Sequence, residues 1–481
     1  MLKQAEKIRL TIPYNFKSRD MAFFGLAALV CFFFMSHPDI WETANHSYVF
    51  LECLFSGRFF DYYEVVAAHD SWYYYINGAN YNILIYIIFG IWELPVFIIN
   101  QIFSLPLDES FMIHWAKAVP CFFYIGCGWM LKNLGEKLGL AKEKAFMAAM
   151  FFLFNPIAFF SPVVMGQYDT LCLFFTLWAL IYYAQGRYQK FSFILGIGVV
   201  CKFFPLMIFV PLILLVEKRI PKLLQYGITT LWLYIPTTLL FMGRTGDAGG
   251  FTMAMINRMF ELTVPMGITD MPLFILLYAI VVFAAFLYNP KSEQTVKYLT
   301  VYVPMVVFGL LFICIHWHPQ WLVLLMPFVV MTTHLHTNRT PWYWLDIVMA
   351  AGYFLIGFCY NAGQTGAVLF DGGWMWMLFD MRIATQKHWM HLDNFLKNVP
   401  FVFQLAPVLF TGSVLANIIL KLPVDNSTLA DRLSDGGHYD RISDKVYLYG
   451  IFVIGFICIW TVPSVLEFLN AFEIISLADV L

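Results

Sequence analysis

Charge is what this chain lacks most. Only 12% of its 481 residues are Asp, Glu, Lys or Arg, whereas 60% are hydrophobic and 19% aromatic, and the formal net charge is −2. About a quarter of the residues in soluble globular domains are charged. This composition therefore excludes a soluble globular domain and predicts an integral membrane protein. We expect no nucleic-acid partner.

Two-residue alternation of apolar and polar side chains is also missing, which excludes an outer-membrane barrel. The long apolar runs instead suit helices, since one helical span needs about 20 apolar residues. The predicted fold is therefore an all-α, polytopic bundle of about 13 transmembrane helices. Clear spans are expected at residues 21–36, 113–131, 145–165, 170–184, 223–242, 272–288, 299–315, 319–333, 343–359, 400–420 and 447–467.

Two further apolar stretches, 81–103 and 191–216, are ambiguous. Cytosolic loops are rich in Lys and Arg. In the first topology the N-terminus is cytosolic, the stretch 81–103 lies in the outer interface without crossing, and the stretch 191–216 enters the membrane and returns as a hairpin. This topology places 21 of the 29 basic residues in the cytosol. In the alternative, 81–103 is an ordinary span and 191–216 crosses once, which moves six of those residues outside. The charge distribution favours the first topology.

This topology creates one long outer loop at residues 37–111. The loop carries nine acidic residues and a single basic one, Arg58. Ionisable groups at a membrane are costly, so each is a functional candidate by default. On this topology they gather at the outer ends of the spans, at Asp39, Glu42, His46, Asp169, Lys202, Arg258, His316 and His318, with the polar Gln167 among them.

The acidic candidates lie mainly in the first outer loop, whereas the cationic ones lie in later segments. This arrangement suits a reaction in which a lipid phosphate is bound or released. Lys, Arg and His stabilise phosphate oxygens through charge-assisted hydrogen bonds. A carboxylate on the opposite side can remove a proton from an attacking hydroxyl. We therefore expect a polar cavity at the outer face, with Asp39 or Glu42 as the base and with Lys202, Arg258 and His318 near the phosphate.

Each candidate also has a purely structural explanation. Asp39 and Asp169 could cap the helices that begin beside them, because Asp favours such positions. Lys202 could extend to the interface from a plain span.

Arg258 and His318 also have purely structural explanations. Arg258 could pair with Glu261, one helical turn away. His318 could satisfy backbone groups that Pro319 leaves free. These alternatives stay open at the level of sequence.

A divalent metal is a further alternative. His316 and His318 could coordinate an ion together with Asp39 or Asp169, because imidazole and carboxylate are common metal ligands. Two histidines two residues apart are a weak signal, and we expect no cofactor.

Several segments together resemble the GT-C superfamily of polytopic glycosyltransferases, which use polyprenyl-phosphate sugars. The acidic "SHPDIWETANH" after the first span is similar to that superfamily's position for the catalytic base. Two segments resemble the bacterial mannosyltransferase and arabinosyltransferase branches: "SPVVMGQYDTLCLFFTLWAL" and "LGIGVVCKFFPLMIFVPLILL". Two others resemble the dolichyl-phosphate-glucose glucosyltransferases: "INRMFE" and "FICIHWHPQ".

The resemblance implies a GT-C-like module at 1–335, which includes the outer loop, and a variable membrane module at 336–481. It implies inverting transfer of a monosaccharide from a polyprenyl phosphate to a hydroxyl of a glycan, glycolipid or protein acceptor. Asp39 and Glu42 would be catalytic, and Gln167, Asp169, Lys202, Arg258, His316 and His318 would bind substrate. A multi-pass protein of the bacterial plasma membrane is favoured over one of the endoplasmic reticulum, with its active site outside or in the lumen. The alternatives are a transporter or flippase, or a polymerase or ligase, of lipid-linked glycans.

Overall fold

The all-α fold class is confirmed in a computed structural model, which describes residues 16–68, 78–104, 108–242, 250–360, 400–424, 427–433, 442–457 and 469. Within these ranges the strands form only two short antiparallel hairpins. They pair β1 (Thr263–Met266) with β2 (Thr269–Pro272), and β3 (Pro423–Val424) with β4 (Ser427–Thr428).

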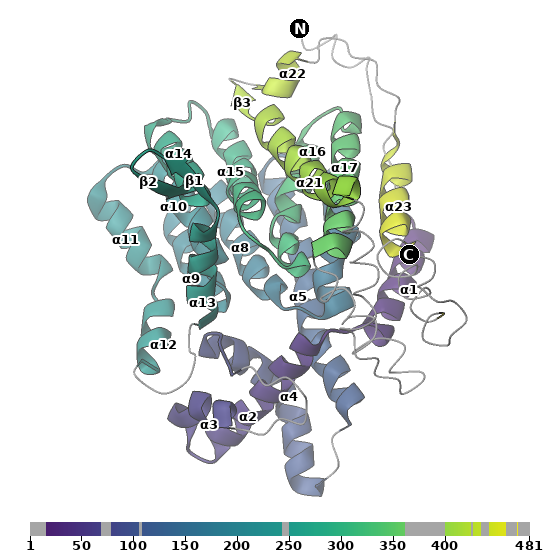
Figure 1. Cartoon of the computed structure of the whole chain (residues 1–481), viewed down its shortest axis with the longest axis vertical. Helices are drawn as coiled ribbons and strands as arrows, with labels where there is room; N and C mark the ends of the chain where they lie inside the picture. Colours follow the sequence, from purple (N-terminus) through teal and green to yellow (C-terminus); the bar gives the residue numbers. More distant parts are fainter. Residues whose placement is uncertain are drawn as a thin grey trace.

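The first half of the chain folds into helices of very different lengths (Figure 1). They are α1 (Ser18–Phe34), α2 (Pro38–Phe55), the 3₁₀ turn η2 (Phe59–Asp61), α3 (Tyr62–Ala68), α4 (Ile83–Phe103), α5 (Glu109–Lys137), α6 (Lys142–Leu153), α7 (Pro156–Phe159), the π-helical η3 (Phe160–Met165), α8 (Asp169–Ala184), α9 (Tyr188–Cys201), α10 (Phe204–Val216), α11 (Ile220–Thr230) and α12 (Tyr234–Leu240).

The second half continues the bundle. Its helices are α13 (Gly250–Glu261), α14 (Leu273–Leu287), α15 (Glu293–Cys314), the 3₁₀ segment η4 (Pro319–Leu324), α16 (Met326–Leu335), α17 (Thr340–Tyr360), α21 (Pro400–Leu420), α22 (Leu429–Leu433) and α23 (Asp444–Gly455). One continuous hydrophobic core joins helices from both halves, from Phe24 in α1 to Phe452 in α23.

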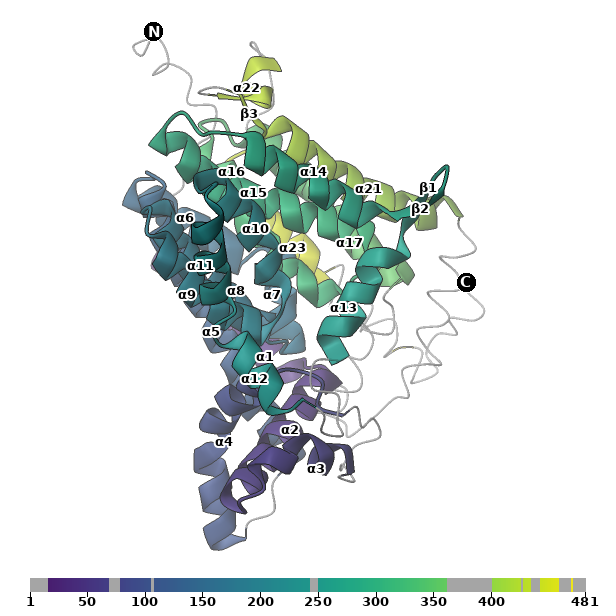
Figure 2. The same cartoon turned by 90° about the vertical axis from the view of Figure 1, so that its left-hand side faces the viewer.

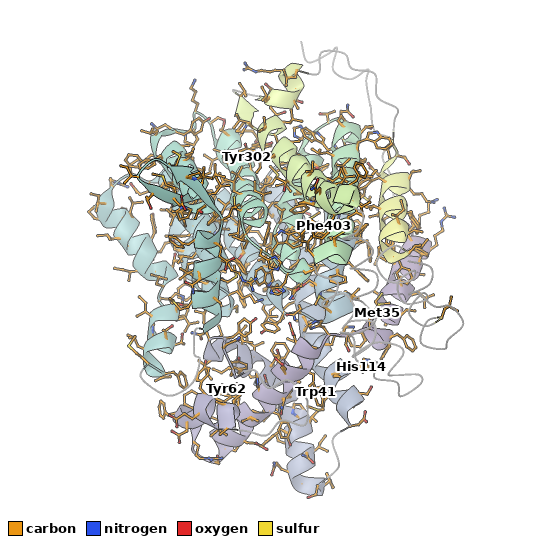
Figure 3. The ribbon with its side chains drawn as sticks, in the orientation of Figure 1. Met35, Trp41, Tyr62, His114, Tyr302 and Phe403 are labelled. Atoms are coloured by element: carbon orange, nitrogen blue, oxygen red, sulfur yellow. The ribbon has the colours of Figure 1, made fainter. Side chains whose placement is uncertain are left out.

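Helices α2, α3 and α4 form a layer at one end of this bundle, opposite the end that carries α22 and β3 (Figures 1 and 2). The layer has a hydrophobic cluster of its own, which includes Tyr62 and Tyr86. In Figure 3, Trp41 and Tyr62 lie in this layer, whereas Tyr302 lies high in the bundle. The polar cavity described below lies between the layer and the bundle.

Membrane-spanning capacity is present in the described part of the chain. By length and composition, α4, α15 and α21 are each long and apolar enough to cross a membrane, and two bent pairs, α1 with α2 and α6 with α7–η3, raise the number to five. Five shorter apolar helices of 10–17 residues accompany them. These helices indicate a membrane protein, and the figure of about 13 spans stays a prediction.

The predicted hairpin at 191–216 is confirmed. Phe191 in α9 stacks on Phe209 in α10, with ring centres 6.2 Å apart, whereas one straight helix would separate them by about 27 Å. The chain therefore turns back at Lys202. Because α9 has 14 residues, it is about 21 Å long, which is shorter than a hydrocarbon core of about 30 Å.

One predicted span is interrupted. The stretch 223–242 is not one continuous helix, because α11 ends at Thr230 and α12 begins at Tyr234, and whether it spans the membrane stays a prediction. Pro236 explains the break, since it has no N–H to donate to the preceding turn. The stretch 81–103 does form a helix, α4, and its position relative to the membrane stays a prediction. The described residues leave out 69–77 and 105–107 of the predicted outer loop, residues 361–399, and residues 458–467 of the predicted last span.

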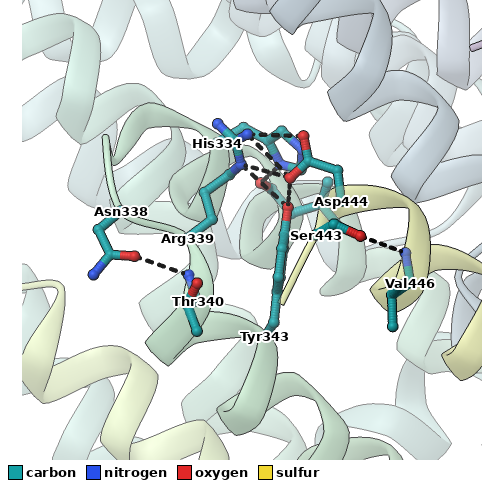
Figure 4. A network of polar contacts seen from close by, with 9 residues as sticks. His334, Asn338, Arg339, Thr340, Tyr343, Ser443, Asp444 and Val446 are labelled. Atoms are coloured by element: carbon teal, nitrogen blue, oxygen red, sulfur yellow. Dashed lines mark hydrogen bonds and ion pairs between the residues drawn. The ribbon is translucent and has the colours of Figure 1, made fainter. Parts of the chain in front are cut away.

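A buried ionic cluster joins α17 to α23 near their first residues (Figure 4). The Arg339 Nη2 donates to both carboxylate oxygens of Asp444, at 3.0 and 2.8 Å, and the Tyr343 hydroxyl donates to the same carboxylate at 2.7 Å. Arg339 is 5% exposed and Asp444 3%. Charges this deeply buried need such complete pairing, because an unpaired one would cost several kcal/mol.

Candidate active site

The layer of α2–α4 and the bundle enclose a polar cavity of about 450 Å³. Its lining comes from six parts of the chain that are distant in sequence: α2, the segment 78–86, the turn after η3, the α9–α10 tip, α13 and the turn after α15. Seven residues singled out in the sequence line it: Asp39, Glu42, His46, Gln167, Lys202, Arg258 and His318.

The acidic wall is the first part of α2. His37 precedes the helix, and its Nδ1 accepts from the backbone N–H of Asp39 at 3.2 Å, so His37 rather than Asp39 caps α2. The Asp39 carboxylate is therefore free of the capping role. Gln167 donates to its Oδ2, and His37 lies 3.1 Å from its Oδ1. Glu42 follows three residues later on the cavity side of the same helix.

A glycine turn brings Gln167 to this wall. Gly166 has a φ of +82°, and a Cβ there would lie 3.1 Å from Lys117 and 3.3 Å from Ile40. Any other residue would be strained in this left-handed conformation and crowded as well. The turn is fixed by two further bonds, from the Gln167 N–H to the Ser161 carbonyl and from the His37 N–H to the Met165 carbonyl.

Lys202 forms a buried ion pair with Asp169. Its Nζ lies 2.6 Å from Asp169 Oδ1, and both side chains are almost fully buried. Burial lowers the pKa of Lys202, but attraction to Asp169 and Tyr81 outweighs it, so the pKa is raised above its ordinary value and the ammonium stays charged. Tyr81 and Tyr168 present their ring faces to it at 5.4 and 5.2 Å.

The pairing of Asp169 with Lys202 was not among the roles expected from the sequence. Asp169 begins α8 without capping it and lies behind Lys202 instead of lining the cavity. Its second oxygen, Oδ2, is buried without a hydrogen-bond partner among the described residues.

Arg258 reaches the cavity from α13 and makes no ion pair with Glu261 among the described residues. Its Nη1 donates to the His316 carbonyl at 3.0 Å, and its Nη2 lies 3.3 Å from His318 Nε2. Its guanidinium carbon lies 5.2 Å from the centre of the Trp321 ring. Arg258 is thus held by uncharged groups.

His318 is a neutral imidazole. Burial, followed by the charge of Arg258, lowers its pKa to about 4, although Asp39 acts in the opposite direction. The His316 side chain is exposed and does not line the cavity, so only its backbone takes part. Within the described ranges no group of three or more His, Cys, Asp or Glu side chains is arranged as metal ligands.

Sequence reasoning missed several residues of this site. Tyr81, Tyr168 and Trp321 surround the two cations, yet the chain is so rich in aromatics that nothing distinguishes them locally. Lys117 donates to the carbonyls of Cys31 and Phe32 at 3.0 Å each and so closes the end of α1. A lysine within an apolar run was the available signal for that contact.

Comparison with family profiles, with curated proteins and with solved structures yields no match to this chain.

Proposed function

We propose that this chain is an integral membrane glycosyltransferase that takes a monosaccharide from a polyprenyl-phosphate donor. One observation carries the proposal. Carboxylates on α2 line the same cavity of about 450 Å³ as Lys202, Arg258 and His318, and this volume is within the range of about 300–1,000 Å³ common for small-molecule sites. The resemblance to the GT-C superfamily supports the same function, and with it a bundle of about 13 spans.

In this proposal Asp39 is the general base. Its carboxylate takes the proton of an acceptor hydroxyl, and the oxygen attacks the anomeric carbon while the bond from that carbon to the phosphate oxygen breaks. The bonding electrons leave with the polyprenyl phosphate, so one displacement inverts the configuration. Gln167 orients the base, because its amide donates to Asp39 Oδ2. Arg258 and Lys202, with His318 beside them, form the basic wall for the departing phosphate.

The cavity would open to the outer or lumenal side, with the bacterial plasma membrane the favoured location. The acceptor would be the hydroxyl of a glycan, a glycolipid or a protein. A lipid-linked donor needs no nucleotide site, and a divalent metal is not required, because protein cations would neutralise the leaving group.

The test uses the purified full chain in liposomes with polyprenyl-phosphate hexoses that carry a labelled sugar. We expect transfer to an acceptor with release of polyprenyl phosphate, and Asp39→Asn should reduce the rate by about 10²–10⁴-fold, the range of a general base. Glu52→Gln is the matched control, because Glu52 lies on the same helix but does not line the cavity.

Two outcomes would contradict the proposal. An Asp39→Asn protein with normal turnover would remove Asp39 as the base, and Glu42→Gln would then be the next variant to assay. Movement of intact lipid-linked sugar across the liposome membrane, without release of polyprenyl phosphate, would identify a flippase instead.

A further inference from the structure

Arg258 occupies an unusual setting for a half-buried arginine, because no carboxylate pairs with it among the described residues. A guanidinium has five N–H groups and cannot accept hydrogen bonds. Its hydrogen bonds within the described residues use two of them, one to the His316 carbonyl and one to His318 Nε2. Three N–H groups of this cavity-lining side chain are therefore left for another acceptor.

The contact with Arg258 determines which nitrogen of His318 carries the proton. Because the guanidinium can only donate, Nε2 must accept, and the proton of the neutral ring resides on Nδ1. Nδ1 is buried and has no partner within the described residues. A cavity ligand cannot reach a buried nitrogen, so neither ring nitrogen of His318 is available to a phosphate.

Trp321 completes the arrangement. The guanidinium carbon lies 5.2 Å from the centre of its ring, and the His318 ring packs against it in a T-shaped arrangement with ring centres 4.9 Å apart. A carbonyl, an imidazole and an aromatic face thus orient Arg258, and none of them neutralises its charge.

We infer that His318 is a positioning residue: its neutral Nε2 accepts from Arg258 and holds the guanidinium so that Arg258, not His318, binds the phosphate of the lipid donor. The inference rests on the proposed function and assigns the phosphate contact within it. A planar guanidinium can bind two phosphate oxygens at once, which requires a fixed orientation.

The sign of the pH dependence follows from this role. The titratable groups that face His318 are Arg258 on α13, Asp39 on α2 with His37 before it, and His316 on the same turn. Protonation would put an N–H on Nε2 against the N–H of Arg258 and break the contact. Phosphate affinity should therefore fall when His318 is protonated, whereas a direct cationic contact would make it rise.

The experiment measures binding of a short-chain prenyl monophosphate to the purified full chain, with matched variants of His318. His318→Gln offers an amide oxygen near the Nε2 position and should stay within about threefold of wild type. His318→Asn is too short, and His318→Lys can only donate, so both should lose about tenfold. In an Arg258→Lys background, His318→Asn should add little, since the two residues act as a unit.

A second readout is the ratio of wild-type to His318→Gln affinity across pH. Protonation of the prenyl phosphate affects both affinities equally, so it does not change their ratio. The ratio should be constant from pH 8 to 6 and should decrease near pH 5 and below. Thermal unfolding of each variant, expected within a few degrees of wild type, separates positioning from folding.

The failures are distinguishable. If the wild type does not bind the prenyl phosphate, the proposed function is overturned and the inference with it. If the wild type binds but His318→Lys retains affinity while His318→Gln loses it, or the ratio rises as the pH falls from 7 to 5.5, the inference alone is overturned.

Discussion

Arg258 and Arg339 lie at opposite ends of the same bundle and are held in opposite ways. Between them run η4 and α16, which together extend about 25 Å. Arg339 binds a carboxylate with two nitrogens and is almost fully buried, with Tyr343 closing the cluster. Arg258 contacts a carbonyl, an imidazole and an indole ring, and its charge is not balanced by any carboxylate in the described part of the chain.

The difference separates charge that holds the fold from charge that is available to a ligand. A buried ion pair with all its hydrogen bonds made has no capacity left for a substrate, and its removal exposes the partner's uncompensated charge. An arginine oriented by neutral groups beside a cavity keeps its charge for an incoming anion. Lys202 is intermediate, because it lines the cavity but pairs with Asp169.

The largest expected effect comes from breaking the cluster at the α17–α23 end. Arg339→Met should lower the free energy of unfolding by about 3 kcal/mol or more, because it leaves Asp444 charged and buried. The combined Arg339→Met, Tyr343→Phe and Asp444→Leu variant should recover most of that loss. Denaturation of the purified protein in detergent measures both, and transfer per folded molecule should stay near wild type. A large loss of turnover in the combined variant would contradict a purely structural role.

A smaller effect is expected when each arginine is replaced by lysine. Arg258→Lys keeps the charge but loses the planar fork, so affinity for a prenyl monophosphate should fall about tenfold, or roughly 1.4 kcal/mol, with stability almost unchanged. Arg339→Lys is the matched variant, and it should reduce stability and leave the affinity of the folded fraction unchanged. If both substitutions affect stability alone, the distinction between the two arginines fails.

Much of the fold was predictable because hydropathy and charge are local signals. The helices α8, α14 and α21 begin and end within a residue or two of the predicted spans, and the hairpin at Lys202 followed from the positions of basic residues in the loops. Pro236 shows the limit of this reasoning. Its break of the span at 223–242 depends on a single missing N–H, which an average over 20 residues conceals.

The candidate site was predictable as a set of residues but not as a set of contacts. Asp39, Lys202 and Arg258 do line one cavity, as their position at one side of the membrane suggested. Which groups pair is decided by three-dimensional proximity, so the pairing of Asp169 with Lys202 had no signal in the sequence. The cluster of Arg339 and Asp444 was missed for the same reason, since the two residues are 105 positions apart.

The smallest expected effect is the loss of stability at acidic pH that a second buried histidine, His336, causes at the Arg339 end of the bundle. Burial, then the charge of Lys421, lowers the pKa of His336 to about 4, although Asp431 opposes the shift. Because the ordinary value is 6.5, the unfolded chain binds a proton more readily between those values. His336 therefore favours the folded state above pH 6.5 and loses that contribution as the pH falls towards 4.

His336→Asn should remove this dependence. Between pH 7.5 and pH 5.5 the wild type should lose about 1 kcal/mol more stability than the variant, as measured by unfolding at both pH values. Prenyl phosphate affinity at pH 5.5 should be the same in both proteins, because His336 lies at the end of α16 remote from the cavity. An affinity change in His336→Asn would mean that the two ends of the bundle are coupled and that their charges do not serve separate tasks.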